Sequence, residues 1–201
     1  MTTLPPSINL ALIRRALQED LGAGDITTKA VVPPKRRIRA QIIAKAPGVV
    51  AGVTIAQQVF RTVDPSLHSG LRRRIRCRIR RKDGPRVRRG DAILSVHGNA
   101  RTILAAERTA LNFLGHHSGI ATLTRAFVDR VKPSRAAILD TRKSLPGLRA
   151  LEKYAVRIGG GQSHRASLSD AVLIKTNHLH ALGQGAGGRG RGKLIARAVE
   201  Q

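Results

Sequence analysis

The chain of 201 residues carries 37 Lys and Arg against 12 Asp and Glu, a formal net charge of +25, and its composition is 41% hydrophobic but only 2% aromatic. This length and hydrophobic content allow one or two domains with an aliphatic core. A single cysteine, Cys77, excludes an internal disulfide framework. The sequence contains no apolar run of membrane-spanning length and no signal-peptide pattern at its start, so we expect a cytoplasmic protein that does not enter the membrane.

The positive charge is the most unusual feature of the composition. Such an excess of cations favours anionic partners: nucleic acid, anionic lipid or small polyanionic substrates. Most of the cations are arginine, and a codon bias toward arginine would produce much of the same excess. With one Tyr, three Phe and no Trp, the chain lacks the aromatic platforms on which single-strand binders stack bases. We therefore do not expect nucleic acid as the main partner.

The first half of the chain predicts alternating helices and strands. Ser7 is placed to cap a helix that runs to about Asp20, with its larger apolar side chains on one stripe. Residues 37–46 alternate between apolar and polar side chains, which predicts a half-buried strand. After a turn at Pro47, residues 54–63 predict a short helix.

The most basic segment of the chain, residues 71–81, also has strand periodicity. Its apolar side chains alternate with arginines, which predicts a strand with one solvated face. A turn at Asp83 leads to another strand over 91–96. These elements predict an α+β domain whose sheet has one open face.

Beyond Gly98 the pattern changes to long helices and short apolar runs. Residues 100–114 predict one helix, and apolar residues up to Val131 mark a second helix. The apolar runs 136–139 and 171–174 flank a helical stretch over 148–158, which is the pattern of a βαβ unit in a parallel sheet. The domain boundary is therefore expected within 100–135.

Polar side chains follow both apolar runs. Residues 140–143 (Asp-Thr-Arg-Lys) follow the first run and residues 175–178 the second, while 159–161 are three glycines that precede His164 and Arg165. Functional residues gather at the carboxyl ends of parallel strands, and Arg and Lys there suit a small, multiply charged anion. Each cation alone is more typical of a solvated loop, and three glycines are more typical of a helix end than of a phosphate cradle. The residues themselves thus indicate an anion-binding α/β domain.

The helix over 100–114 has one anomaly. On a helical wheel, Leu104 and Leu111 belong to an apolar arc that contains Glu107 and has Arg108 at its edge. A buried ion pair costs desolvation and is weak evidence of stability. The pair therefore marks either a subunit interface or a site, or else an ordinary salt bridge, and the pattern does not decide between them.

An ordered set of motifs resembles the quinolinate phosphoribosyltransferase family. The motifs are EDLGAGDITT at 19–28, PGVVAG at 47–52, AERTALNFL at 106–114, SGIATLTR at 118–125, DTRKSLPGLR at 140–149, LEKYAVRIGGG at 151–161, HR at 164–165 and DAVLIK at 170–175. The resemblance covers roughly residues 8–180, and the order of the motifs makes it specific. Three positions depart from the family pattern: Thr176 stands where an acidic residue is usual, Ser163 where Asn is common and His117 where Leu is usual.

The resemblance implies an α/β fold in which an N-terminal α+β sandwich domain (1–115) precedes the first part of an open α/β barrel (116–180), followed by a divergent Gly/Arg-rich tail (181–201). Only part of a barrel has a counterpart, so we expect a C-terminally truncated chain with impaired activity. The implied reaction is pentosyl transfer: the phosphoribosyl group of PRPP passes to quinolinate with decarboxylation, giving nicotinate mononucleotide, pyrophosphate and CO2 in NAD biosynthesis.

The resemblance also implies a set of site residues. The implied substrate-binding residues are Arg108, Arg142, Lys143, His164, Arg165 and Lys175, of which Lys143 and Lys175 are also implied to be catalytic. Arg108 would reach the neighbouring site in a homodimer or higher homo-oligomer. Mg²⁺ would accompany PRPP, and its acidic protein ligands are expected beyond the end of this chain.

Three alternatives remain open at this point. Within the family, the pyrophosphorylase associated with molybdenum transport shares similar phrases. A second reading is a basic nucleic-acid-binding remnant that uses residues 72–89 and the Gly/Arg-rich tail. A third is an inactive fragment that folds only in part.

Overall fold

The computed structural model of the chain describes residues 10–64, 75–181 and 192. Residues 1–164 form one compact unit and residues 165–201 a second. The predicted helix cap at Ser7, the start of the basic strand and nearly all of the Gly/Arg-rich tail lie outside the described residues.

The first unit is built on a three-stranded antiparallel sheet with the strand order β1-β5-β3. The strands are β1 (Arg37–Ile43), β3 (Arg76–Ile79) and β5 (Ala92–Asn99), and a second, two-stranded sheet pairs β2 (Gly48–Val49) with β4 (Arg86–Val87). The helices of this unit are α1 (Leu10–Leu21), α2 (Ile26–Val31), α3 (Val53–Val63), α5 (Ala100–Val131) and α6 (Arg149–Ile158). This is the mixed α/β architecture that the sequence predicts.

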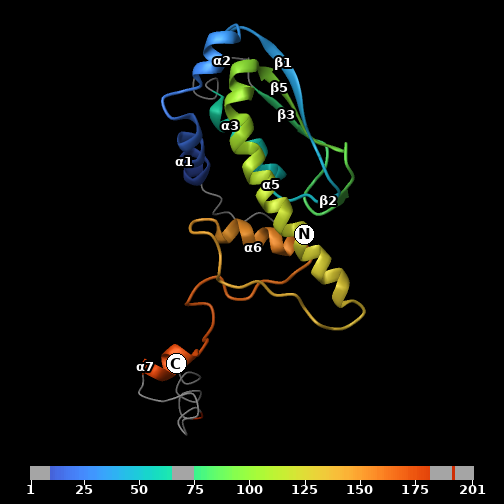
Figure 1. Ribbon diagram of the computed structural model, residues 1–201, viewed down its shortest axis with the longest axis vertical. Coiled ribbons are helices and arrows are strands. Elements are labelled where there is room, and N and C mark those ends of the chain that lie inside the picture. Colours follow the sequence, from blue (N-terminus) through green and yellow to red (C-terminus); the bar gives the residue numbers. More distant parts are fainter. Residues whose placement is uncertain (1–9, 65–74, 182–191, 193–201) are drawn as a thin grey trace. The chain divides into compact units, whose positions relative to one another are not determined.

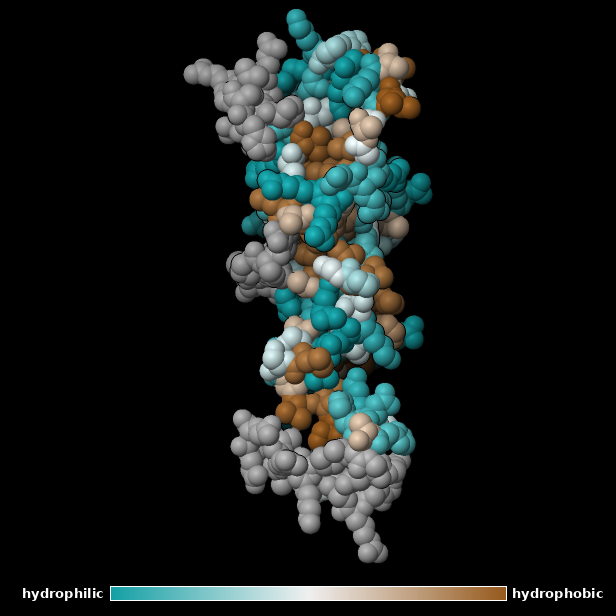
Figure 2. Space-filling view, turned by 90° about the vertical axis from the view of Figure 1, so that its left-hand side faces the viewer, coloured by the Kyte–Doolittle hydropathy of each residue, from teal (hydrophilic) through white to brown (hydrophobic). Residues whose placement is uncertain are grey.

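One face of the three-stranded sheet carries the core. The inward side chains of β1 alternate with exposed ones as predicted, and Leu94 and Val96 of β5 are almost fully buried. Helices α3 and α5 cover this face and α1 packs on both helices, while no described helix packs on the opposite face of the sheet (Figure 1). From the side of α1, hydrophilic and hydrophobic residues are interspersed on the surface (Figure 2).

The motif at 19–28 forms a helix end and a short helix that periodicity alone does not predict. The backbone N–H of Thr28 donates to Asp25 Oδ1 at 2.8 Å, so that Asp25 is the N-cap of α2. These hydrogen bonds from Thr28 lower the pKa of the Asp25 carboxyl. The motif therefore has a local structural reason, because it ends α1 and starts α2.

Helix α5 corrects two predictions. It is one helix of 32 residues instead of two, since its buried face continues without a break from Phe113 through His117 to Ala121. Glu107 and Arg108 are both exposed and form no ion pair with any described residue, so neither the buried pair nor the salt bridge is found. The buried arc is rotated away from Glu107.

The small sheet is held to α5 by two side-chain hydroxyls. Ser118 Oγ accepts a hydrogen bond from the Ala51 N–H at 3.0 Å, and Thr122 Oγ1 accepts one from the Val49 N–H at 2.8 Å. In this contact the motif at 47–52 supplies the backbone donors and the motif at 118–125 the side-chain acceptors.

Asp83 connects three segments of the first unit. Its carboxylate accepts the backbone N–H groups of Gly52 at 2.9 Å and Val53 at 3.0 Å, and it also accepts the Tyr154 hydroxyl at 2.7 Å. Gly52 has a left-handed φ of 96° and supplies no side-chain cap, so Asp83 caps α3 from a distant loop. Burial is the main reason why the pKa of Tyr154 is raised.

The predicted βαβ unit is present in another form. Leu139 forms a parallel bridge with Gln162, which directly follows the three glycines, and the Gln162 N–H donates to Ile138 O at 2.8 Å. The run 171–174 is not a strand; it is exposed and lies in the second unit, before α7 (Thr176–Ala181). Short apolar runs carry no period, so periodicity alone could not choose between the two segments.

Candidate functional site

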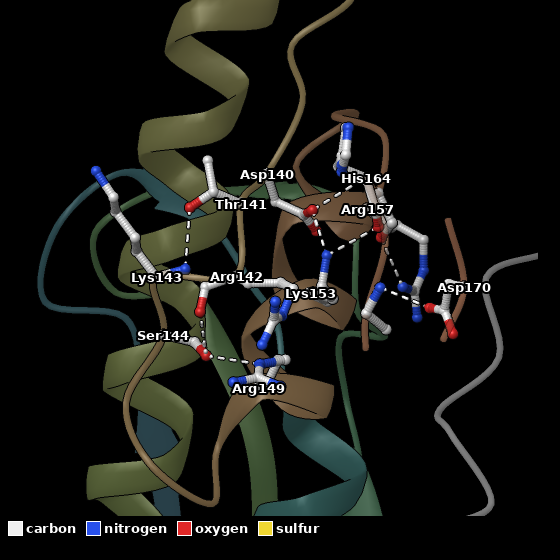
Figure 3. A network of polar contacts seen from close by, with 12 residues as sticks. Asp140, Thr141, Arg142, Lys143, Ser144, Arg149, Lys153, Arg157, His164 and Asp170 are labelled. Carbon is white, nitrogen blue, oxygen red and sulfur yellow. Dashed lines mark hydrogen bonds and ion pairs between the residues drawn. The ribbon is translucent and has the colours of Figure 1, made fainter. Parts of the chain in front are cut away.

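The centre of the candidate site is a buried ion pair between Asp140 and Lys153 (Figure 3). Asp140 directly follows Leu139, which forms the parallel bridge with Gln162 and ends the predicted barrel strand 136–139; we call this segment the first strand. Lys153 projects from α6, and the side chains of Asp140 and Lys153 are only 7% and 5% exposed. Asp140 Oδ1 also accepts the His164 N–H at 2.9 Å, while Lys153 Nζ donates to His164 O at 3.0 Å. The pair therefore fixes the backbone of His164 beside the end of the first strand.

The predicted cations of the first strand end lie next to this pair. Arg142 is half-buried, and its Nε is buried without a hydrogen-bond partner among the described residues. Lys143 is exposed and its side chain points away from Arg142 (Figure 3). Arg149 Nε donates to Ser144 Oγ at 3.1 Å. Of these two predicted cations, Arg142 is therefore the one with a partly buried side chain and with an Nε–H that has no partner among the described residues.

The three glycines at 159–161 allow the backbone after α6 to pack closely against its neighbours. A Cβ at Gly159 would lie 2.6 Å from Ala121 O, and one at Gly161 would lie 2.9 Å from Thr124 Cγ2. Gly160 has a φ of 94°, which side chains rarely adopt. The glycines let the turn after α6 approach α5 and the first strand, so their role here is structural, in line with the helix-end interpretation.

Arg108 is not part of the network around Asp140. It lies on the exposed side of α5, where it makes no hydrogen bond with a described residue. Its predicted role in a neighbouring subunit's site stays a prediction.

The second unit contains the other two predicted cations. Arg165 Nη1 donates to Ala171 O at 2.9 Å, and Asp170 accepts the backbone N–H of Ala166 at 2.7 Å. Lys175 is exposed, and its N–H donates to His178 Nδ1 at 2.8 Å. The structure therefore brings together Asp140, Lys153 and the backbone of His164, with Arg142 two residues after Asp140, while convergence with Lys175 stays a prediction.

Lys153 and Asp140 are the site residues that strand-end reasoning missed or left without a role. The sequence contains one signal for Lys153, since it stands between Leu151 and Tyr154 on the buried face of α6. A lysine on an apolar face requires a buried partner, because an uncompensated buried charge is costly. Asp140 supplies that partner.

A second concave region lies between α1, α5 and the loop after the first strand. It is a pocket of about 350 Å³ whose lining includes Glu19, Asp20, His116 and His117. His117 is fully buried; its Nδ1 lies 2.6 Å from Phe113 O, and its Nε2 has no partner among the described residues. Burial lowers the pKa of His117. The motifs at 19–28, 106–114 and 140–149 contribute to its lining, but the sequence alone predicts no pocket here.

Metal binding has no ligand set within the described part of the chain. Its residues contain no group of three or more His, Cys, Asp and Glu side chains placed to hold an ion. None of the described helices is long and apolar enough to cross a membrane.

Comparison with protein families gives two adjacent matches. Residues 25–118 match the N-terminal domain of quinolinate phosphoribosyl transferase, and residues 120–190 match its C-terminal domain. Together the two profiles cover most of the chain.

Two curated relatives share about half of the aligned residues. The nicotinate-nucleotide pyrophosphorylase [carboxylating] of Mycobacterium leprae is 50% identical over 172 residues, which are 85% of this chain and 58% of the relative. The chloroplastic enzyme of the same name from Arabidopsis thaliana is 47% identical over 86% of this chain and 47% of the relative. The chain thus spans about half the length of the curated relatives it matches.

A solved structure shows the same fold. NadC from Streptococcus pyogenes superposes with a TM-score of 0.86 at 39% sequence identity, over 98% of this chain and 65% of the other. The architecture described above is therefore shared with a homologue of the matched sequence family.

Proposed function

Because the chain belongs to the quinolinate phosphoribosyltransferase family, we propose that it acts in the transfer of the phosphoribosyl group of PRPP to quinolinate. The products are nicotinate mononucleotide, pyrophosphate and CO2. The observation that carries the proposal is the half-buried Arg142 at the strand end, beside His164 and the Asp140–Lys153 pair. The names of the curated relatives support this reaction over the molybdenum-related alternative.

Quinolinate has two carboxylates, and the site offers cations of the matching kind. Arg142 is half-buried, and its buried Nε has no hydrogen-bond partner among the described residues. A guanidinium can bind a carboxylate through two parallel hydrogen bonds, so Arg142 is the candidate partner of one quinolinate carboxylate. Lys143 and His164 add exposed polar groups within the first unit. Neutralising the carboxylates would reduce their repulsion of the PRPP phosphates.

The main catalytic effect of these residues is positioning. Catalysis by positioning requires that the binding groups themselves are rigid. The Asp140–Lys153 pair provides this rigidity, because it holds both the N–H and the C=O of His164. Quinolinate bound beside this segment would have its ring nitrogen oriented toward C1 of the ribose.

Among the described residues, the network around Asp140 does not include Arg108, Arg165 or Lys175. We assign substrate binding also to Arg108, Arg165 and Lys175, and catalysis to Lys143 and Lys175, on the strength of the family motifs in which they stand. Arg108 would act across a homodimer, where its exposed position on α5 leaves it available to a second copy.

Mg²⁺ belongs to the proposal only as the companion of PRPP. Oxygen atoms of the PRPP pyrophosphate group would be among its ligands. No step is assigned to the ion. A cytoplasmic location is likewise a proposal and is based on the low cysteine content; the plant relatives are named chloroplastic or mitochondrial.

Turnover tests the proposed reaction directly. Incubation of the chain with quinolinate, PRPP and Mg²⁺ should give nicotinate mononucleotide and CO2 in equal amounts, and Arg142→Ala should abolish both. Arg130→Ala, which changes an exposed arginine at the end of α5, is the control and should leave the rate unchanged. Absence of product from the unchanged chain would contradict the proposed activity.

A further inference from the structure

The open face of the three-stranded sheet carries a regular group of arginines that the proposed reaction does not use. We call this group the arginine face; it consists of Arg37, Arg39, Arg76, Arg78 and Arg80. All five side chains are exposed, and they come from β1, from β3 and from the residue that follows β3. They alternate along the strands with the partly buried side chains that pack on the core, so they lie on the side of the sheet opposite α3 and α5.

Strand register brings these arginines into rows. Arg39 and Arg76 both pair with His97 of β5, one from each side, and Arg78 pairs with Ser95 in the next row. Arg80 reaches the same strip, since its Nε donates to Ser95 Oγ at 2.9 Å. Same-face residues along a strand are about 7 Å apart, and the two outer strands are about 10 Å apart. The face is therefore a small grid of cations around a polar central strand.

The grid has no counter-charge of its own. Strands β1, β3 and β5 contain no Asp or Glu. The ion pairs of the described residues involve other arginines, Arg81 and Arg86, and none of the five in the arginine face. Like charges at this spacing repel each other, and a covering polyanion would relieve the repulsion.

We propose that the arginine face binds the phosphodiester backbone of a single-stranded nucleic acid. A guanidinium fork matches a phosphate group in shape and charge, and successive phosphates supply the repeated negative charges that a grid of cations requires. The central strand adds hydrogen-bonding groups at Ser95 and His97. The face is a flat sheet surface without a helix that could enter a duplex groove, which favours a flexible single strand.

The chemistry of the face also sets its selectivity. Its strands contain no aromatic residue other than His97, so stacking of successive bases cannot contribute much. Binding is therefore independent of base sequence and depends on ionic strength. This property is separate from the proposed transferase activity and uses none of its residues.

The test is fluorescence anisotropy of a labelled single-stranded RNA of about 20 nucleotides, titrated with the full chain at several salt concentrations. Five arginine–phosphate contacts predict that log Kd rises with log salt with a slope of about 3.5, so that binding weakens about 100-fold between about 50 and 200 mM salt. The variant Arg39→Gln/Arg76→Gln/Arg78→Gln should lower the slope by about 2.

A matched control removes the same charge elsewhere. Arg14→Gln/Arg15→Gln/Arg130→Gln changes three exposed helix residues and should keep the slope of the unchanged chain, with circular dichroism confirming that both variants fold. Equal losses in the two variants would show that net charge binds RNA without a defined surface, and would overturn the proposal. Binding to phosphatidylserine vesicles without binding to RNA would assign the face to a membrane surface and would also overturn it.

Discussion

At the scale of single residues, the site depends on two charges that are removed from water. Asp140 and Lys153 are almost fully buried, and they compensate each other while also bonding the His164 backbone. The desolvation of such a pair is costly, so its benefit to stability is small, whereas the removal of one partner leaves an uncompensated charge. The main effect of the pair is therefore to fix the backbone of His164 next to Asp140, which stands two residues before Arg142.

Lys153→Met should therefore destabilise the fold strongly. It leaves the Asp140 carboxylate buried without its partner, and we expect the free energy of unfolding to fall by about 3–5 kcal/mol, measured by urea denaturation. The double variant Asp140→Leu/Lys153→Met should recover most of this loss, because an apolar pair of similar volume removes the desolvation cost. A double variant as unstable as the single one would contradict this account of the pair.

His117 adds a dependence of stability on pH. Burial holds its pKa below the ordinary value of 6.5, so between the lowered folded pKa and 6.5 the unfolded chain binds more protons than the folded one. Stability is therefore fully present above about pH 6.5 and is lost as the pH falls through this window. His117→Leu should make the melting temperature less sensitive to acid between about pH 7.5 and pH 5.

The control for this experiment is His180→Gln, which changes an exposed histidine and should leave the pH dependence of the melting temperature as it is. If His117→Leu melted with an unchanged dependence on pH, buried His117 would not be its source.

At the scale of elements, α5 organises the first unit. It covers the sheet with its N-terminal half, binds β2 through Ser118 and Thr122, and packs against α6. The long helix thus joins the sheet domain to the segment that carries the site. The close approach of the α6 end to α5 depends on Gly159, where any side chain would meet the backbone of α5.

Gly159→Ala should loosen this contact. The added Cβ would lie 2.6 Å from both Ala121 O and Thr124 Cβ, and overpacking of this kind costs about 1–3 kcal/mol in the free energy of unfolding. The matched control is Gly119→Ala in α5, where a Cβ would meet nothing within 4 Å and should stabilise the helix by up to about 1 kcal/mol. Equal effects of the two substitutions in thermal denaturation would contradict the packing role of Gly159.

Asp83→Ala tests the second connection between elements. It removes the distant cap of α3 and the partner of the Tyr154 hydroxyl, and hydrogen bonds to a charged group contribute about 1.5–3 kcal/mol each. We expect the free energy of unfolding to fall by at least about 2 kcal/mol in urea. Asp91→Ala, which removes the ion-pair partner of the exposed Arg81 and one acceptor for the Arg88 N–H, should cost less; the reverse order would contradict the capping role.

At the scale of the whole molecule, the sequence predicts those helices and strands whose apolar residues recur with a regular period. Alternation identified β1 and its buried face, and helical spacing identified α3 and α6 close to their observed bounds. The family motifs added the fold and the membership that periodicity could not supply.

What the sequence did not predict depends on contacts between distant segments. The bridge between Leu139 and Gln162 is a single pairing without a period, and the ion pair of Lys153 joins α6 to a strand end thirteen residues away. The continuity of α5 was missed because two glycines interrupt its apolar pattern, although neither interrupts the helix. Arg142 was named from the sequence because functional groups gather at strand ends whichever segment pairs with the strand, and its role in substrate binding stays a prediction.

Calorimetric titration of the purified chain with quinolinate tests the central claim most directly. The account predicts saturable binding that Arg142→Ala weakens at least tenfold, a loss of about 1.4 kcal/mol or more, while Arg130→Ala binds like the unchanged chain. Absence of saturable heat in the unchanged chain, or equal affinity in Arg142→Ala, would contradict the claim that this strand end is the carboxylate site.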